Sequence, residues 1–344
     1  MFIRFFKFRR MMQYSDVDRK LIEILRILSE YNKPAGARII AKKLEERGFK
    51  LDERTVRYHL KILDEKGLTE NLGYDGRIIT KKGLEEIKNA FVADRVGFVI
   101  TKIESLIFNM DFDLKKGKGK IVANLAVLDK KYFRKAFQIM KKVIQAGYAV
   151  SPHIKIFDEN ELYQNYVVPK GKIMVATMCS ITLDGILHHA GIPVTPRFGG
   201  VVQVLKKKPV RFTELIAYSG STLDPLEVFS VKGLSSVLDV VKTGNGYILA
   251  NFREIPMDAL EKTKEKFEEA ERLGIKGVLM VGEPNIPVLG VPVRINKIGI
   301  ALMGGINPLT AINEAKIPIE TKAIECLINF EEMENINKIK NFEF

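Results

Sequence analysis

LDERTVRYHLKILDEKG, residues 51–67, has the pattern of one amphipathic helix. Val56, Leu60 and Leu63 recur at helical spacing, and Asp52 precedes them as a residue type that caps helix N-termini. The other faces carry guanidinium, hydroxyl, phenol and ammonium groups, which bind phosphates and base edges. In a helix taken alone, such a basic face is more often simply solvated. The neighbouring segments favour a recognition helix that enters a DNA groove.

Two further amphipathic segments precede this helix. Residues 16–31 and 37–47 each carry an apolar stripe at helical spacing, and Pro34 separates the two. Three helices joined by tight turns form a helix-turn-helix unit, in which the third helix lies in the major groove. The order of segments therefore places residues 51–67 in the position that contacts bases.

A hairpin pattern follows the third helix. Residues 68–80 predict two short strands around a glycine-containing turn with Arg77 near its tip, and residues 81–90 predict a closing helix. TVRYHLKILDEKGL with this hairpin resembles the winged-helix regulators, so we predict a winged helix DNA-binding domain over residues 13–90. A winged helix that contacts only protein is the alternative. The predicted DNA-binding residues are polar or basic: Arg38, Arg54, Thr55, Arg57, Tyr58, Lys61 and Arg77.

The positive charge is concentrated at the N-terminal end of the chain. Residues 1–90 hold 21 Lys or Arg against 14 Asp or Glu, a net charge of +7. The other 254 of the 344 residues carry only the remaining +6 of the net +13. Such a distribution is expected where a polyanion binds.

Several classes of protein are disfavoured by what the sequence lacks. No apolar run reaches about 18 residues, so we expect no membrane span. Cys179 and Cys326 are 147 residues apart without a CxxC motif, which fits a reducing cytoplasm better than a disulfide framework or a zinc site. P-loop, nucleophile-elbow and paired-carboxylate motifs are absent. We expect a cytoplasmic protein with no catalytic residues, no metal and no cofactor.

The rest of the chain contains an internal repeat. Residues 119–150 align with 246–278 at an offset of 127, which matches Asn124 with Asn251. Each copy has the pattern of a buried strand, a turn and a helix. We therefore predict a multi-domain α/β protein in which a duplicated α/β domain spans residues 95–326, with two copies packed about a pseudo-twofold axis.

Two more correspondences extend the repeat. Residues 191–204 align with 290–303 at an offset of 99, and residues 216–229 align with 300–313 at an offset of about 83. The falling offsets predict insertions of roughly 28 and 16 residues in the first copy. The expected boundaries are half-repeats at about residues 115–235 and 240–326, and loose ends at 1–12 and 331–344.

The third correspondence holds the strongest candidate for a small-molecule site. An apolar strand leads through a glycine turn to Asp224-Pro225, where a helix beginning would direct its free amides at one place. On this motif alone, an ordinary strand-to-helix turn is the commoner explanation. Arg197 lies near two glycines and suits bidentate binding of a carboxylate, while Asn124 and Arg253 are further polar residues at strand ends. The predicted effector-binding residues are Cys179, Ser180, Thr182, Arg197, Ser219, Ser221, Thr222 and Asn251.

The order of these motifs resembles one family. A winged helix followed by ANLAVLDKKYF, MCSITLDGILHHAGIPVTPRFGGVVQV and IAYSGSTLDPLEVF is similar to the NrpR-type archaeal nitrogen regulatory repressors over about residues 14–326. The resemblance implies a dimer that binds double-stranded operator DNA of nitrogen-assimilation genes. It also implies release from DNA by 2-oxoglutarate, a dicarboxylate effector and not a cofactor. Some members carry two regulatory domains where this chain has one, so a homodimer and a heteromer with a related repressor are both open.

Two other functions fit the same residues. One is an enzyme of small-molecule metabolism whose fused winged helix regulates its own operon, and the other is a co-regulator whose repeat domain only dimerises. The absence of an acid, base or nucleophile constellation disfavours the enzyme. Binding of 2-oxoglutarate would separate the ligand-gated repressor from the co-regulator.

Overall fold

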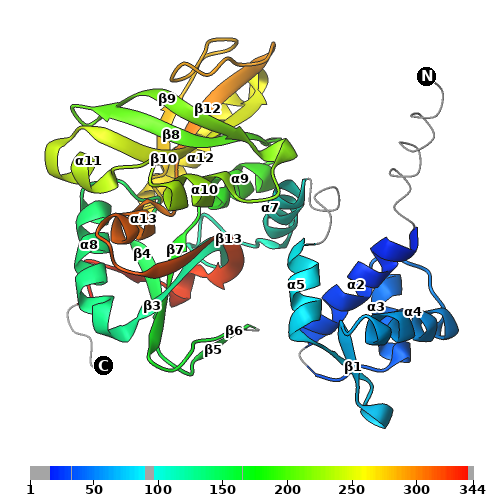
Figure 1. Cartoon of the computed structure of the whole chain (residues 1–344). Helices are drawn as coiled ribbons and strands as arrows, with labels where there is room; N and C mark the ends of the chain where they lie inside the picture. Colours follow the sequence, from blue (N-terminus) through cyan, green and yellow to red (C-terminus); the bar gives the residue numbers. More distant parts are fainter. Residues whose placement is uncertain (1–15, 32, 90–96, 165, 340–344) are drawn as a thin grey trace, which may run out of the picture. The chain divides into compact units, whose positions relative to one another are not determined.

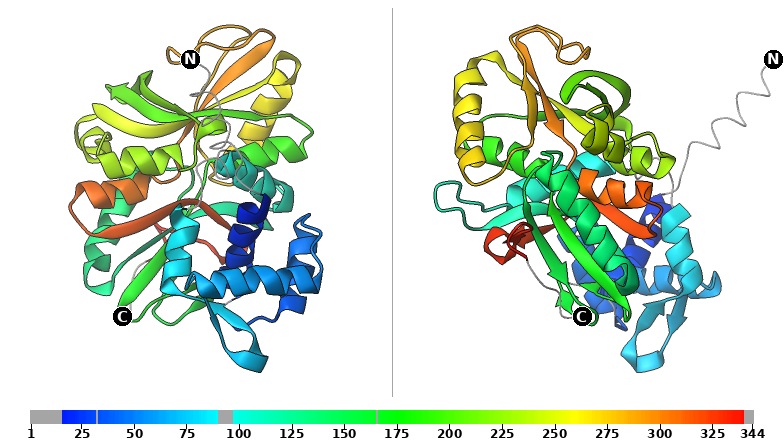
Figure 2. Two further views of the ribbon diagram at one scale, coloured as in Figure 1. Left: turned by 45° about the vertical axis from the view of Figure 1, so that its right-hand side comes forward. Right: turned by 90° about the vertical axis from the view of Figure 1, so that its left-hand side faces the viewer.

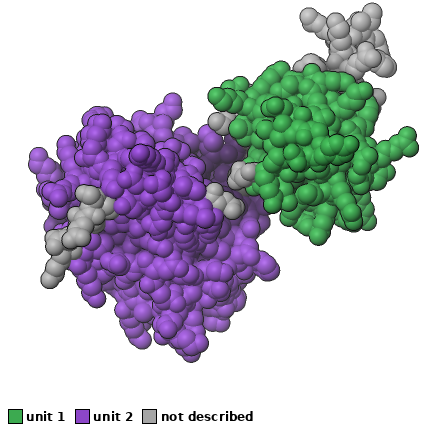
Figure 3. Space-filling view, turned by 90° about the horizontal axis from the view of Figure 1, so that it is seen from below, with its two compact units in different colours: residues 1–94 green, residues 95–344 purple. Residues whose placement is uncertain are grey.

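The computed structural model describes residues 16–31, 33–89, 97–164 and 166–339. The chain divides into two compact units, residues 1–94 and 95–344, which Figure 3 shows in different colours. The loose end predicted at residues 1–12 lies outside the described residues. None of the helices within the described ranges is long and apolar enough to cross a membrane.

The first unit is a small helical bundle with a β-hairpin (Figure 1). Its elements are α2 (Asp16–Tyr31), α3 (Ala37–Glu46), α4 (Glu53–Glu65), β1 (Thr69–Asn71), η1 (Gly73–Asp75), β2 (Arg77–Ile79) and α5 (Lys81–Asn89). The apolar stripes of the first three helices meet in one core, where Ile24, Leu44 and Leu60 are fully buried. The Asp52 carboxylate accepts a hydrogen bond from the Thr55 amide at 2.7 Å and caps α4. The predicted winged helix-turn-helix is confirmed.

The second unit contains two antiparallel sheets with helices packed around and between them (Figures 1 and 2). The first sheet is formed by β3 (Lys120–Asp129), β4 (His153–Phe157), β7 (Lys172–Met178), β13 (Ile319–Asn329) and β14 (Glu334–Asn335). The second sheet is formed by β8 (Thr195–Leu205), β9 (Lys208–Ala217), β10 (Gly246–Pro256), β11 (Val278–Val281) and β12 (Lys297–Met303). A separate hairpin is formed by β5 (Leu162–Tyr163) and β6 (Tyr166–Val167).

The helices of this unit connect the strands and fill the space between the sheets. They are α7 (Phe98–Asn109), α8 (Phe133–Gln145), α9 (Ile181–His189), α10 (Pro225–Lys232), α11 (Val237–Thr243), α12 (Leu260–Arg272) and α13 (Asn307–Glu314). Short 3-10 turns precede three of them, including η3 (Tyr218–Gly220) before α10. Leu226 and Phe229 of α10 are buried in the main core together with residues of both sheets. The predicted mixture of helices and strands in a duplicated domain is confirmed.

The two copies of the repeat share one order of elements. The sequence β3, α8, β4, β7, α9 in the first copy recurs as β10, α12, β11, β12, α13 in the second. The offset is 127 residues at Gly119 and Gly246, and 125 residues at Lys172 and Lys297. It therefore stays almost constant along the repeat.

The two later correspondences predicted from the sequence are wrong. Residues 297–303 form β12, whose counterpart is β7 at residues 172–178 and not β8 at 195–205. The insertions of roughly 28 and 16 residues therefore do not exist as predicted. The error arises because a glycine, a proline and an apolar strand recur at both places, and this local pattern does not state which neighbour the strand pairs with.

The last strand of each copy is exchanged between the sheets. β8 belongs to the first copy but pairs with β10, the first strand of the second copy. β13 belongs to the second copy but pairs with β3, the first strand of the first copy. Each sheet is therefore complete only when both copies are folded.

The C-terminal segment is packed and not a loose end over residues 331–339. β14 pairs with β4 through Glu334 opposite Ile154, and the side chain of Ile336 is fully buried. An apolar side chain in that place stabilises the segment, because burying it removes its surface from water. Residues 340–344 lie outside the described residues.

Candidate nucleic-acid interface and effector site

Helix α4 presents the predicted DNA-binding side chains to solvent. Val56, Leu60 and Leu63 are buried, while the side chain of Arg57 is 69% exposed and that of Lys61 is 75% exposed. The remaining predicted residues of the helix are exposed or half-buried: Arg54, Thr55 and Tyr58. One face of α4 is thus available for a groove, as the spacing of its apolar residues predicts.

Two of these cations have acidic neighbours one helical turn away. Arg57 pairs with Glu53, and Lys61 lies 3.9 Å from Glu65. Solvent-exposed pairs of this spacing contribute about 0.3–0.5 kcal/mol, so a phosphate can displace the carboxylate at little cost. Arg54 has no ion-pair partner among the described residues. Arg38 is exposed at the start of α3.

The wing lacks the basic tip that the sequence predicted. Its tip is η1, whose three residues carry no positive charge. Arg77 instead begins β2, where its Nε donates to Oδ2 of Asp64 in α4 at 2.8 Å. The Thr69 hydroxyl donates to the other oxygen of the same carboxylate at 2.6 Å. Asp64 therefore joins the wing to α4, and the Arg77 guanidinium is committed to this contact.

The second unit contains a buried ion pair where helix α9 meets strand β10. The Arg253 Nε donates to Oδ2 of Asp184 at 2.7 Å, and both side chains are almost completely buried. Asp184 Oδ1 and Arg253 Nη2 have no hydrogen-bond partner in the described part of the chain. Burial raises the pKa of Asp184, and the adjacent guanidinium opposes that shift. Two unpaired polar atoms in one buried pair mark a place where a ligand could complete the hydrogen bonding.

Five more polar side chains surround this pair. The Arg253 guanidinium lies 5.3 Å from the centre of the Tyr218 ring, and the Tyr218 hydroxyl donates to Oδ1 of Asn251. Asn251 Nδ2 in turn donates to the Ser180 hydroxyl at 2.8 Å. Cys179 adjoins Ser180, and burial raises the pKa of its thiol to about 12. We call this group the buried polar cluster: Cys179, Ser180, Asp184, Tyr218, Asp224, Asn251 and Arg253.

Asp224 supplies the carboxylate of the cluster that caps helix α10. Its Oδ1 accepts hydrogen bonds from the amides of Leu226 at 2.9 Å and Glu227 at 3.2 Å, while Oδ2 has no partner among the described residues. Burial raises the pKa of Asp224 to about 6, and the two amide hydrogen bonds oppose the shift.

Asp224 is expected to make the protein less stable as the pH rises. In the folded state the Asp224 carboxyl keeps its proton up to about pH 6, whereas its ordinary pKa is 3.8. Between these pH values the folded state therefore binds more protons than the unfolded state. Its contribution to the free energy of unfolding falls by about 3 kcal/mol over that range, at about 1.4 kcal/mol per pKa unit. Asp224→Asn keeps the capping oxygen without the charge, and should raise the thermal midpoint above pH 6 relative to the unsubstituted protein.

The measurement is the difference in thermal midpoint between Asp224→Asn and the unsubstituted protein from pH 5 to pH 8. Burial raises the pKa of Glu227 to about 7 and the Asp224 charge adds to that shift, so both proteins are compared in a Glu227→Gln background. Asp258→Asn, on an exposed residue, is the matched control and should leave the pH dependence unchanged. A difference that does not grow with pH would show that Asp224 does not titrate near pH 6 in the folded protein.

The structure brings together only some of the predicted effector residues. Cys179, Ser180 and Asn251 lie in the buried polar cluster. The Thr182 hydroxyl is occupied, because it accepts from the Val122 amide and donates to the Val122 carbonyl, both at 3.1 Å. Ser219 is exposed in η3, and Ser221 and Thr222 are half-buried in the segment that leads to α10.

Arg197 is placed on the other side of the sheet from the cluster. Its Nε lies 3.6 Å from Oε2 of Glu254, a fully buried carboxylate that Arg294 also contacts at 2.5 Å. Successive side chains of a strand point to opposite faces, so Glu254 and Arg253 face away from each other in β10. Arg253, which the sequence suggested only as a polar strand residue, therefore holds the place predicted for Arg197. Its spacing of two residues from Asn251 was the signal that could have found it.

Comparisons with known proteins identify the family. Residues 96–335 match the family described as NrpR regulatory domains NRD1 and 2, and residues 22–87 match the Ribonuclease R winged-helix domain. The global nitrogen regulator NrpRI of Methanosarcina mazei is 43% identical over 93% of this chain and 98% of its own length. The global nitrogen regulators NrpR of Methanocaldococcus jannaschii and Methanococcus maripaludis are 35% and 36% identical, and this chain spans 56% and 55% of their lengths.

A solved structure shows the same fold. The crystal structure of a nitrogen repressor-like protein from Methanococcus jannaschii is 32% identical, with a TM-score of 0.60 over 69% of this chain and 98% of that one. The relatives are named as regulators, which agrees with the prediction of a regulatory protein and not an enzyme. The chain belongs to the NrpR family of nitrogen regulators.

Proposed function

We propose that this protein is a transcriptional repressor of nitrogen-assimilation genes that binds operator DNA as a dimer and is released by 2-oxoglutarate. The observation that carries the proposal is the coexistence of an exposed basic face on α4 with an incompletely bonded buried arginine in the regulatory unit. The names of the relatives support a role in nitrogen regulation. A dimer would present two recognition helices to successive turns of the duplex, about 34 Å apart.

Arg253 suits the binding of a small dicarboxylate. A guanidinium can hold a carboxylate through two parallel hydrogen bonds, and Nη2 of Arg253 is free of any partner in the described residues. The Ser180 hydroxyl accepts from Asn251 and keeps its own proton to donate to the rest of the ligand, while the Tyr218 hydroxyl already donates to Asn251. The segment from η3 to the start of α10, which contains Ser219, Ser221 and Thr222, would have to open to admit the ligand.

Binding of 2-oxoglutarate to the full chain is the direct test. Arg253→Lys keeps the positive charge opposite Asp184 but loses the planar fork, so it should weaken 2-oxoglutarate by about 10- to 100-fold in calorimetry. Arg197→Lys, on the opposite face of β10, is the matched control and should bind normally. Release from a labelled operator fragment, followed by fluorescence anisotropy, should require correspondingly more 2-oxoglutarate in Arg253→Lys alone.

Two results would contradict the proposal in different ways. If millimolar 2-oxoglutarate produces no heat, it is not the effector, and the alternative of a co-regulator whose repeat domain only dimerises is favoured. If the substitutions at Arg197 and Arg253 weaken 2-oxoglutarate binding equally, 2-oxoglutarate is still the effector but the buried polar cluster is not its binding site.

A further inference from the structure

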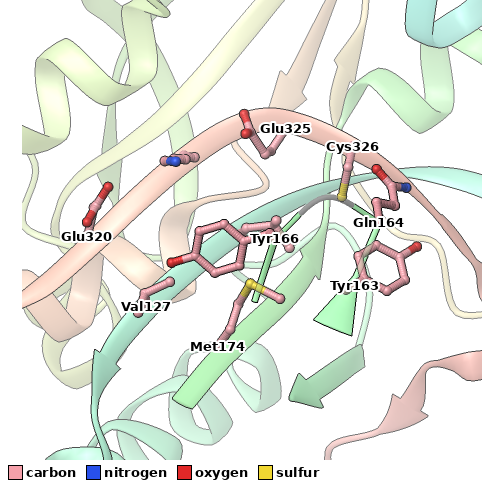
Figure 4. Close-up of a pocket in the computed structure, with 10 residues that line it drawn as sticks. Val127, Tyr163, Gln164, Tyr166, Met174, Glu320, Glu325 and Cys326 are labelled. Carbon is pink, nitrogen blue, oxygen red and sulfur yellow. The ribbon is translucent and has the colours of Figure 1, made fainter. Parts of the chain in front are cut away.

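A cavity of about 240 Å³ lies on the first sheet, apart from the buried polar cluster (Figure 4). Its floor is apolar and comes from neighbouring strands: Leu125 and Val127 of β3, and Met174 of β7. Tyr163 and Tyr166 of the β5–β6 hairpin form the opposite wall. The cavity is therefore enclosed between a sheet and a hairpin that crosses it.

Hydrogen bonds hold the hairpin in this position. The Tyr163 hydroxyl donates to the Leu327 carbonyl of β13 at 2.7 Å, and Gln164 Nε2 donates to the same oxygen at 2.9 Å. The Tyr163 ring also packs on Phe157 of β4, with ring centres 4.9 Å apart. The hairpin thus contacts both β13 and β4, on opposite sides of the strands that form the cavity floor. These contacts hold the hairpin above the floor, so that the space between them is not filled by side chains.

Strand β13 places two opposite charges along one rim of the cavity. Glu320 is paired in register with Val127 and Lys322 with Leu125, so both side chains are on the face that forms the floor. Within the described part of the chain neither has an ion-pair partner, although Lys322 Nζ lies 5.6 Å from the centre of the Tyr166 ring. The third charged residue of the lining, Glu325, is already paired with Lys102 at 2.7 Å.

The two free charges stand two residues apart on one strand, a spacing of about 7 Å. A small molecule whose ammonium and carboxylate groups are bonded to the same carbon can contact both at once. An apolar remainder would lie on Leu125, Val127 and Met174 and against the tyrosine rings. A volume of about 240 Å³ holds on the order of eight water-sized groups, at about 30 Å³ for each.

We propose that this cavity binds an α-amino acid with an aliphatic side chain of the size of valine, leucine or methionine. Lys322 contacts the carboxylate, Glu320 contacts the ammonium group, and the side chain enters the apolar cavity. A buried apolar side chain adds affinity in proportion to the surface removed from water. This site is distinct from the one proposed for 2-oxoglutarate, and it adds a second class of ligand to the regulatory unit.

Calorimetric titration of the full chain tests the proposal with three compounds of one shape. L-Leucine carries both charges, 3-methylbutylamine lacks the carboxylate, and 4-methylpentanoate lacks the ammonium group. We expect saturable binding of L-leucine and binding about tenfold weaker or less for each analogue, because each loses a charge-assisted hydrogen bond.

Paired variants assign the charges to residues. Lys322→Met should weaken the binding of L-leucine by about tenfold and leave that of 3-methylbutylamine, which has no carboxylate, almost unchanged. Glu320→Gln should likewise weaken the binding of L-leucine but leave that of 4-methylpentanoate, which has no ammonium group, almost unchanged. Val127→Phe fills the cavity and should abolish binding of L-leucine. Lys170→Met, on an exposed residue after the hairpin, is the matched control. Thermal midpoints should be close to that of the unsubstituted protein for the two rim variants, since both side chains are exposed.

The proposal is overturned by either of two outcomes. The first is the absence of heat with valine, leucine and methionine at millimolar concentration. The second is binding that Val127→Phe and Lys322→Met leave intact, which would place the ligand elsewhere. Because 2-oxoglutarate is titrated separately, neither outcome bears on the proposed repressor function.

Discussion

Arg253→Met is expected to destabilise the regulatory unit by about 3–5 kcal/mol, the largest effect of any single substitution considered for this protein. The reason is that Asp184 would remain buried without the guanidinium that its Oδ2 contacts. A carboxylate in that position must either take up a proton or leave the core, and both cost free energy. Urea unfolding followed by circular dichroism measures the loss.

The double variant Asp184→Leu with Arg253→Met separates the two parts of this cost. Replacing a buried ion pair by apolar side chains is often neutral or stabilising, so the double variant should regain most of the lost stability. It should nevertheless fail to bind 2-oxoglutarate, since the guanidinium is gone. A double variant as unstable as Arg253→Met alone would show that Arg253 stabilises the protein through contacts other than Asp184.

Arg57→Ala is expected to weaken operator binding by about 1–3 kcal/mol if the guanidinium contacts a guanine edge in the major groove. If it contacts only phosphate, the loss of affinity should be smaller and equal for all DNA sequences. The slope of the logarithm of the binding constant against the logarithm of the salt concentration should then decrease in magnitude by about one. The side chain is exposed on α4 and its partner Glu53 is one turn away on the same surface. Fluorescence anisotropy at several salt concentrations distinguishes the two cases.

Arg26→Ala is the control for charge alone. Arg26 lies in α2, outside α4, and is paired with Glu23. Its loss removes the same positive charge from the unit and should change the affinity by no more than about twofold. Equal effects at Arg26 and Arg57 would mean that α4 is not the surface that contacts DNA.

The winged-helix unit could be predicted almost entirely from local sequence. The helical spacing of Val56, Leu60 and Leu63 determines the buried side of α4, and Asp52 marks its start, as the structure confirms. Both signals lie within one element, so they need no knowledge of the partners. The wing tip was predicted wrongly because the position of Arg77 depends on Asp64, thirteen residues away in another element.

The buried polar cluster was less predictable because its residues come from distant segments. Asp184, Tyr218 and Arg253 approach each other only through the packing of α9, η3 and β10. No spacing along the chain indicates such an encounter. The alternation of a strand did carry usable information, since Asn251 and Arg253 must share a face. Arg197 was preferred in the sequence for its glycine neighbours, which reflect close packing: a Cβ on Gly199 would lie 2.6 Å from Pro225.

The exchange of β8 and β13 bears on the origin of the regulatory unit. A polypeptide containing one copy would have a vacant place beside its first strand, and only the last strand of a second copy fits there. Such a polypeptide would close its sheets as a pair of identical molecules with two equal interfaces between them. Fusion into one chain frees the halves to diverge, and they have done so: Ser180, Asp184 and Arg253 correspond to Gly305, Leu309 and Ala126. The polar groups come from both halves, Ser180 and Asp184 from the first and Arg253 from the second, and the corresponding set in the other place is apolar or glycine.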